Sequence, residues 1–189
     1  MEHAECSNGR PGSPPVWTRH NRTVIPLPRL RPITEADRPA VERLWQLYKH
    51  DLSESRGSQP DDVGLFKPGR LPGYFDDPDK AGVLITYNDA LAGFAFIDGL
   101  LHEPKMIGDF FVVRAVRRHG VGFQVATELI PRYPGHWEIG FQANNARVPE
   151  FWRRVVTHLV GTNWREETRP VPDKPHIPHD HFIVFDVKS

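Results

Sequence analysis

The chain has 189 residues, and its 24 Lys and Arg balance 24 Asp and Glu, so the formal net charge is zero. This length suits one domain with a tail. The balanced charge argues against non-specific nucleic-acid binding, which needs a broad positive field. The single cysteine, Cys6, excludes an intrachain disulfide. Neither a membrane-spanning apolar run nor the pattern of a signal peptide occurs, so we expect a cytoplasmic protein.

The first 28 residues carry five prolines among polar residues, which predicts a disordered N-terminal extension over 1–28. A single domain then occupies residues 29–189. It opens with a short strand that contains Leu30 and Ile33. Apolar residues at helical spacing between Val41 and Leu52 predict an amphipathic helix that begins near Pro39.

Residues 55–80 are rich in Gly, Pro and Asp and predict a long loop with at most a short helix near residues 71–75. Such a loop is either a wall of a substrate site or an ordinary surface loop. Apolar runs at 83–87 and 91–97, separated by Asn88-Asp89, then predict a β-hairpin. The stretch 106–113 predicts a central strand buried on both faces.

The second half of the chain continues the alternation of strands and helices. The sequence predicts a helix over 123–130 that ends at Pro131, a strand over 137–141, a helix over 148–159 and a last strand over 182–187. The order β-α-β-β-β-α-β-α-β is typical of an α/β fold, with a mixed central β-sheet flanked by helices on both faces.

A glycine- and arginine-rich loop, residues 114–122, connects the strand at 106–113 to the next helix. Glycines there let the backbone approach a ligand closely, and the first N–H groups of the helix favour an anion. Arg117 and Arg118 add positive charge, so we interpret Arg117 to Gly122 as a pyrophosphate-binding loop. The alternative is a helix start eased by glycine, which is common in α/β proteins. Neither a Rossmann nor a P-loop glycine pattern is present.

The loop resembles the R-x-x-G-x-G signature of the GNAT superfamily of N-acyltransferases. The strings DFFVVRAVRRHGVG and NNARVPEFWRRVV are similar to a bacterial branch of predicted acetyltransferases. The resemblance covers residues 29–187. It implies the GNAT fold, in which the central strands, here 106–113 and 137–142, splay apart and hold the thioester between them.

The resemblance also implies acetyl-CoA as co-substrate, an amine of a small molecule or peptide as acceptor, and no metal. Dimerisation is frequent in the family, so a homodimer is possible. Asn145 matches an asparagine that commonly contacts the cofactor, although a turn or N-cap role is the alternative. The implied cofactor-binding residues are Val112, Val113, Arg114, Arg117, Arg118, His119, Gly120, Val121, Gly122, Phe123, Asn145 and Trp152.

Amide formation requires a base that takes a proton from the amine. Asp109 begins the strand that ends at the loop, where many family members place a glutamate, so it is the candidate catalytic base. The alternative is a strand-end residue bonded to a loop N–H. Many GNAT enzymes carry a tyrosine seven residues after the asparagine, and Trp152 stands there instead. Trp152 either contacts the cofactor or packs in the core, while Tyr133 and His158 are other candidate acids.

Three further groups of residues have weaker interpretations. His176, His179 and His181 with Asp180 favour a loop over a metal site. His102 and Glu103 are either acceptor-binding residues or a solvated turn. Arg153, Arg154 and Arg165 leave open a tRNA donor, although zero net charge argues against one. A longer acyl-CoA, a carrier protein, or a non-catalytic acyl-CoA-binding module are the remaining alternatives.

Overall fold

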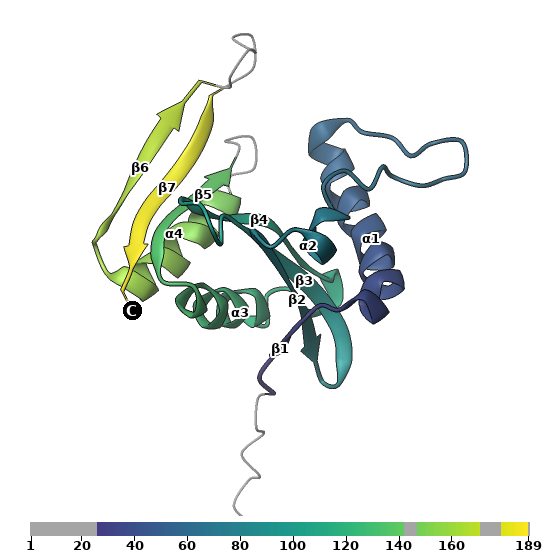
Figure 1. The fold of residues 1–189 in the computed structure, drawn as a ribbon, viewed down its shortest axis with the longest axis horizontal. Coiled ribbons are helices and arrows are strands. Elements are labelled where there is room, and N and C mark those ends of the chain that lie inside the picture. Colours follow the sequence, from purple (N-terminus) through teal and green to yellow (C-terminus); the bar gives the residue numbers. More distant parts are fainter. Residues whose placement is uncertain (1–25, 142–146, 171–178, 189) are drawn as a thin grey trace, which may run out of the picture.

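A seven-stranded sheet with the order β1-β2-β3-β4-β5-β7-β6 forms the centre of the molecule (Figure 1). The computed structural model describes residues 26–141, 147–170 and 179–188. All neighbouring strands are antiparallel except β4 and β5, which run parallel. The strands are β1 (Arg29–Pro32), β2 (Lys80–Tyr87), β3 (Ala90–Asp98), β4 (Lys105–Val112), β5 (Gly135–Phe141), β6 (Trp164–Arg169) and β7 (Asp180–Val187).

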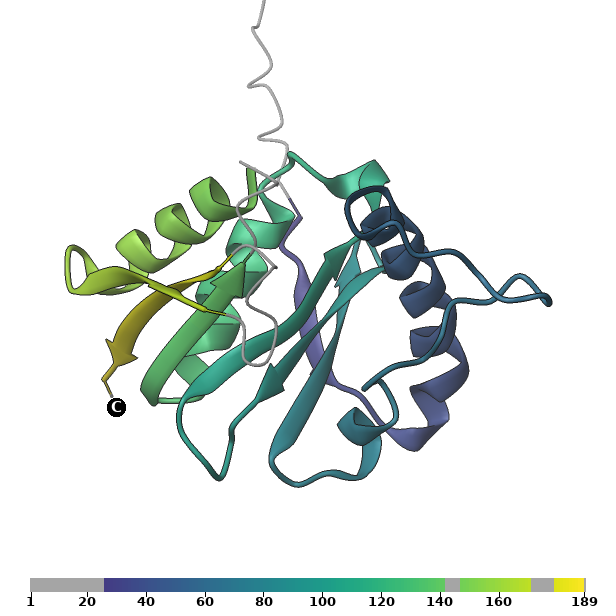
Figure 2. The ribbon, with the colours of Figure 1, turned by 90° about the horizontal axis from the view of Figure 1, so that it is seen from above.

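Helices cover both faces of this sheet (Figures 1 and 2). The helices α1 (Arg38–Arg56) and α2 (Gly73–Asp76) lie on one face, and α3 (Val121–Leu129) and α4 (Arg147–Val160) lie on the other. The predicted mixed sheet with helices on both faces is therefore confirmed. None of the helices that the structure describes combines the length and the apolar composition needed to cross a membrane.

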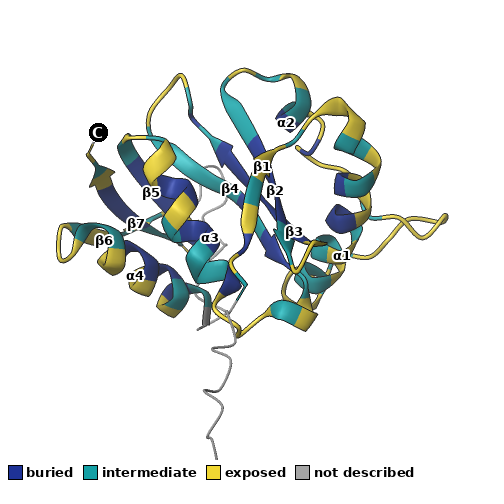
Figure 3. Ribbon diagram, turned by 90° about the horizontal axis from the view of Figure 1, so that it is seen from below, coloured by how far each residue is buried: buried dark blue, intermediate teal, exposed yellow. Residues whose placement is uncertain are grey.

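Alternation along the central strands divides the buried residues between the two faces of the sheet (Figure 3). On β3, Phe94 and Phe96 pack towards α1, which contributes the buried Trp45. The intervening Ala95 packs towards the other face, where α3 contributes Leu129. The same alternation on β4 directs Phe111, and with it Asp109, towards α1. The side of the sheet that each β4 residue faces is thus fixed by its position in the strand.

The strand β6 is absent from the predicted element order, which has no strand between the helix over 148–159 and the last strand over 182–187. Four of its six residues are charged, so the period-2 pattern of apolar residues that signals a strand is missing. β6 pairs with β7 along its whole length and forms an edge of the sheet. Charged side chains are typical of edge strands, because they oppose pairing with other chains.

The remaining differences concern element ends. β2 begins at Lys80 and not near residue 83, and the short helix in the 55–80 segment is α2, at residues 73–76. The helix α3 ends at Leu129, directly before the turn that contains Pro131, as the proline predicted. The larger part of the predicted N-terminal extension, residues 1–25, lies outside the described residues.

Candidate functional site

The two parallel strands β4 and β5 separate soon after they meet. Only Lys105 and Met106 of β4 pair with β5, opposite Trp137 and Glu138, although β4 continues to Val112. A cavity of about 220 Å³ opens where the strands diverge. The splayed central strands predicted above are confirmed. The lining residues come from β4, β5, α1 and α4: Tyr48, Leu52, Ser55, Arg56, Ile107, Gly108, Asp109, Phe110, Ile139, Gly140, Phe141, Val148 and Trp152.

Asp109 lies within β4, opposite Phe96 of β3, and its side chain reaches this cavity. The residue is only 7% exposed. Its Oδ1 accepts a hydrogen bond from the Tyr48 hydroxyl at 2.6 Å, and its Oδ2 accepts one from Arg70 Nε at 2.9 Å. The alternative interpretation of Asp109, a strand-end residue bonded to a loop N–H, holds only in part: Asp109 lies within β4 and not at its end, and the loop N–H that it accepts belongs to the Arg70 side chain. Both partners are side chains, one from α1 and one from the segment between α1 and α2.

Tyr48 and Arg70 hold the carboxylate in place from two sides. Burial raises the pKa of the Tyr48 hydroxyl, and the neighbouring Asp109 carboxylate raises it further, so Tyr48 remains a neutral donor. Arg70 also pairs with Asp98 at 3.1 Å and donates to the Gly108 carbonyl. The helical period placed Tyr48 in an apolar stripe, but no pattern in the sequence indicated that Arg70 would reach β4.

A second cavity, of about 210 Å³, lies beside the first on the α1 side. Tyr48, Leu52, Arg56 and Asp109 line both cavities. The residues that line only the second are Trp45, Lys49, Gly69 and Arg70. Gly69 and Arg70 thus bring the loop that follows α1 to the wall of the second cavity, which supports the first of the two interpretations of the 55–80 segment.

The loop after β4 presents the N-terminus of α3 to the surface. Gly120 caps the helix with a left-handed φ of 80°, a conformation that glycine adopts without strain. The first helical bond runs from the Gln124 N–H to the Gly120 carbonyl, so three N–H groups precede it, those of Val121, Gly122 and Phe123. Unpaired N–H groups at a helix N-terminus attract an anion.

Arg114 and Arg117 point away from this N-terminus and towards α1. The Asp51 carboxylate pairs with Arg114 at 2.7 Å and also with Arg117. Arg117 Nε in addition donates to the Val112 carbonyl at 2.6 Å, and the Val113 N–H donates to Ala92. In this structure Arg117 therefore stabilises the loop from the side of α1. The neighbouring Arg118 and His119 are exposed.

Comparisons with solved structures match this architecture to that of several acetyltransferases. No family model and no curated protein matches the sequence. An acetyltransferase from Thermus thermophilus superposes with a TM-score of 0.62 at 14% identity, covering 86% of this chain and 99% of that one. The ribosomal L7/L12 alpha-N-protein acetyltransferase RimL, solved in complex with coenzyme A, gives 0.61 at 15% identity, with 85% and 94% covered.

A third structure carries the name of the fold. An acetyltransferase assigned to the GNAT family, from Bacteroides thetaiotaomicron, gives a TM-score of 0.55 at 16% identity and covers 85% of this chain and 88% of that one. The chain has the GNAT fold. The fold expected from the resemblance is thereby confirmed, and the cavity between β4 and β5 lies at the divergence that defines it.

Trp152 crosses from α4 to the cavity of this GNAT fold. It is 6% exposed, and its ring centroid lies 5.4 Å from that of Phe110 and 4.8 Å from that of Phe151. Trp152 therefore packs in the core and lines the cavity at once. Tyr133 and His158, the other candidate acids, line neither cavity. Asn145 lies outside the described residues.

None of His102, Glu103, His179, Asp180 and His181 lines either cavity. The Asp79 carboxylate accepts the His102 N–H, and Glu103 accepts the N–H of His136. His181 stacks on Phe141, with centroids 5.9 Å apart. His176 is outside the described residues. In the part of the chain that the structure describes, no three His, Cys, Asp or Glu side chains converge to hold a metal ion.

The arginines considered for RNA binding are engaged elsewhere. Arg153 of α4 pairs with Glu166, and Arg165 of β6 pairs with Glu167. Arg154 lies over the Phe123 ring, 4.9 Å from its centroid. None of the three lines either cavity.

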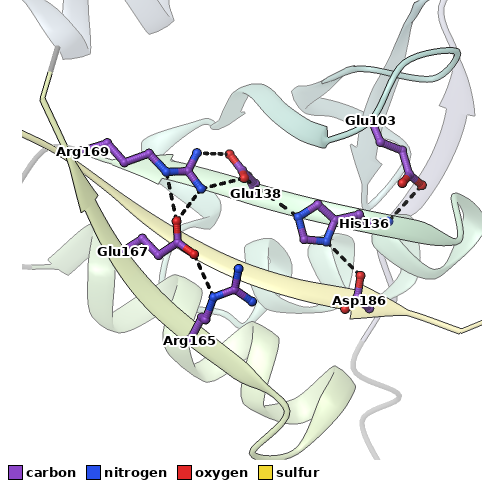
Figure 4. Close-up of polar contacts among 7 residues, drawn as sticks. All are labelled: Glu103, His136, Glu138, Arg165, Glu167, Arg169 and Asp186. Atoms are coloured by element: carbon purple, nitrogen blue, oxygen red, sulfur yellow. Dashed lines mark hydrogen bonds and ion pairs between the residues drawn. The ribbon is translucent and has the colours of Figure 1, made fainter. Parts of the chain in front are cut away.

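A second polar cluster lies on β5, β6 and β7 (Figure 4). Arg169 binds both oxygens of the buried Glu138, at 2.6 and 2.8 Å, and also pairs with Glu167. His136 Nδ1 lies 2.9 Å from the Asp186 carboxylate. Because Trp137 and Ile139 face α4, the intervening Glu138 faces the opposite side. These contacts link three strands side by side, so we assign the cluster a structural role.

Proposed function

We propose that the chain is an N-acyltransferase that transfers an acetyl group from acetyl-CoA to a primary amine of a small molecule or peptide. The observation that carries the proposal is the cavity at the β4–β5 divergence. The buried carboxylate of Asp109 lies on its wall, and β4 leads from it to the α3 N-terminus. The acetyltransferases that share the fold support the acetyl group, and the coenzyme A complex of one of them supports the donor.

Each end of the donor would meet a suitable part of the chain. The N–H groups of Val121, Gly122 and Phe123 would bind the pyrophosphate, with Arg118 supplying charge. A Cβ added at Gly122 would come no closer than 3.6 Å to Phe110 and Phe151, so this glycine is not required by the packing of the described residues. That freedom fits a role in the approach of a ligand. Bound acetyl-CoA would supply an activated thioester.

Asp109 would serve the acceptor amine. An alkyl ammonium has a pKa of roughly 10, so it must lose a proton before it can attack. Both oxygens of Asp109 already accept hydrogen bonds, from Tyr48 and Arg70, so a water between amine and carboxylate is the expected route. We propose that the thiolate leaves unassisted, because a thiol pKa of about 8.5 makes it a fair leaving group.

Coenzyme A binding tests the donor site. Gly120→Glu places a carboxylate beside the α3 N-terminus and should weaken the affinity for coenzyme A at least about tenfold by charge repulsion. Gly161→Glu is the matched control, because Gly161 has a similar φ of 64° and open surroundings at the far end of α4. Calorimetry that finds no affinity in the wild-type chain, or equal losses in both variants, contradicts the proposal.

A non-catalytic acyl-CoA-binding module is the second candidate, and Trp152 is the observation that favours it. An indole donates a hydrogen bond but does not give up its proton to a thiolate. A panel of donors and amines with detection of free thiol separates the two candidates. Coenzyme A affinity without thiol release from any acyl-CoA or acyl carrier protein, and without deacylation of an aminoacyl-tRNA in the presence of an amine, would support the module. Thiol release with an amine would support the enzyme.

A further inference from the structure

The second cavity is lined by more positive than negative side chains. Lys49, Arg56 and Arg70 line it, and Asp109 is the only carboxylate among its lining residues. Arg70 already pairs with Asp109 at 2.9 Å and with Asp98 at 3.1 Å. The charge of Asp109 is therefore matched within the wall, and the charges of Lys49 and Arg56 remain.

Neither of these two cations forms an ion pair with any residue between 26 and 141 or in the two later described stretches. Lys49 is held at the cavity wall, where its Nζ lies 5.7 Å from the ring centroid of the buried Trp45. Arg56 is the last residue of α1 and lines both cavities. It therefore borders the space beside Asp109 as well as the second cavity.

This charge distribution has two consequences for an amine acceptor. Neighbouring cations disfavour an ammonium, so they repel a simple protonated amine but assist its conversion to the neutral, reactive form. An acceptor that carries a carboxylate close to its amine gains an attraction that offsets the repulsion. A cavity with two cations lacking ion partners is thus suited to an anionic or zwitterionic amine.

We propose that the acceptor is an amine bearing a carboxylate, which Arg56 and Lys49 bind in the second cavity while the amine reaches Asp109 in the first. This inference rests on the proposed N-acyltransferase function. In the transfer, the amine nitrogen forms a bond to the acyl carbon and the carbon–sulfur bond breaks. The electron pair of that bond leaves with the thiolate, and the amine proton passes to Asp109 through water. The carboxylate belongs either to a free amino acid or to the side chain of an acidic first residue of a peptide.

Pairs of acceptors in which an amide replaces the carboxylate test this inference. Glycine against glycinamide represents the free amino acid, and a peptide amide beginning with aspartate against one beginning with asparagine represents the acidic peptide. In at least one pair, kcat/KM for the carboxylate member should exceed that of its amide about tenfold. Arg56→Gln and Lys49→Gln should each reduce this ratio several-fold without changing the affinity for coenzyme A. Arg43→Gln, on the exposed side of α1 and in neither cavity, should leave the ratio unchanged.

Direct binding of the same acceptors to the coenzyme A complex distinguishes failure of this inference from failure of the proposed function. One outcome is that no thiol is released with any acceptor, but the carboxylate member binds more tightly than its amide and loses this advantage in Arg56→Gln. That outcome would support the inference and would overturn the enzymatic function. Equal binding and equal turnover of both members in both pairs would overturn the inference. So would a ratio that the two variants leave unchanged, or a preference for a peptide that begins with lysine.

Discussion

The hydroxyl of Tyr48 lies 2.6 Å from Oδ1 of Asp109 and donates a hydrogen bond to it. This contact joins the middle of α1 to the strand that borders the cavity. Together with Arg70 it fixes the orientation of a carboxylate that the sequence singled out as the candidate base.

Replacing Asp109 by asparagine keeps the shape of the side chain and removes its ability to take a proton. If Asp109 is the base, Asp109→Asn should lower kcat roughly 100-fold or more, the range typical of general base catalysis. The affinity for coenzyme A should stay within about twofold of the wild type. Steady-state kinetics and calorimetry measure the two quantities. Asp98→Asn removes another carboxylate that pairs with Arg70 but lies outside both cavities, so a similar loss of kcat in this control would contradict a catalytic role.

The alkaline limit of stability should depend on Tyr48. Because burial and Asp109 raise its pKa in the folded state, the unfolded chain releases the Tyr48 proton at lower pH than the folded chain does. The contribution is therefore complete below about pH 10, the ordinary tyrosine pKa, and is lost as the pH rises further. In Tyr48→Phe, the free energy of unfolding should fall less steeply above about pH 10. Denaturant unfolding at several pH values measures the slope, and parallel curves for both proteins would contradict the prediction.

Most of the fold follows from patterns in the sequence, and the exceptions have physical reasons. Apolar periodicity and proline gave α1, the β2–β3 hairpin, β4, α3 and α4 because these elements bury one face or both. The strand β6 was missed because it is held by pairing with β7 and by ion pairs such as Arg169 with Glu138, and neither leaves an apolar period.

The candidate site was only partly accessible from the sequence. The motif correctly located the α3 N-terminus, because glycine and helix-start signals are local. The direction of the Arg117 side chain could not be predicted from the sequence, because its partner Asp51 lies on α1, 66 positions away. The same holds for Arg70, which reaches β4 from a loop with no periodic pattern. Long-range pairing of charged side chains depends on the tertiary structure.

The ion pairs of Asp51 with Arg114 and Arg117, which connect α1 to the loop before α3, should be sensitive to acid. Burial acts to raise the pKa of Asp51, but hydrogen bonds from Arg117 and Arg114 outweigh it and hold this pKa below its ordinary value. The unfolded chain thus binds the proton first. The stabilisation is present above about pH 4 and is lost as the pH falls through the lower folded pKa. The difference in unfolding free energy between wild type and Asp51→Asn should shrink from about pH 6 to about pH 3.

Asp89→Asn is a suitable control for the acid experiment. Asp89 pairs with Arg29 at 3.1 Å, but both side chains are at least 80% exposed, so the pair contributes little. This variant should track the wild type at every pH. A pH-independent difference for Asp51→Asn would show that the ion pairs do not cause the acid sensitivity.

The ion pairs of the β5–β7–β6 cluster differ in how much they contribute to the free energy of unfolding. Arg169→Met leaves the carboxylate of Glu138, which is 8% exposed, without its bidentate partner. Because Arg169 itself is partly exposed, we expect a loss of about 1–2 kcal/mol in unfolding free energy, less than for a fully buried pair. Arg165→Met removes a more exposed partner of Glu167 and should cost under about 0.5 kcal/mol. Equal losses in denaturant unfolding would contradict this ranking.

The short pairing of β4 with β5 forms a seam in the sheet, a line at which few residues of the two strands pair. Five of the six strand pairings are ladders of four to eight residue pairs, but the two halves of the sheet meet through the two residue pairs of β4 and β5 and are otherwise joined by helix packing. Amide hydrogens along the seam should exchange with solvent sooner than those inside either half. A ligand that lies in the seam would slow this exchange and raise the melting temperature in proportion to the logarithm of its concentration. Binding would thus stabilise the sheet along its shortest strand pairing.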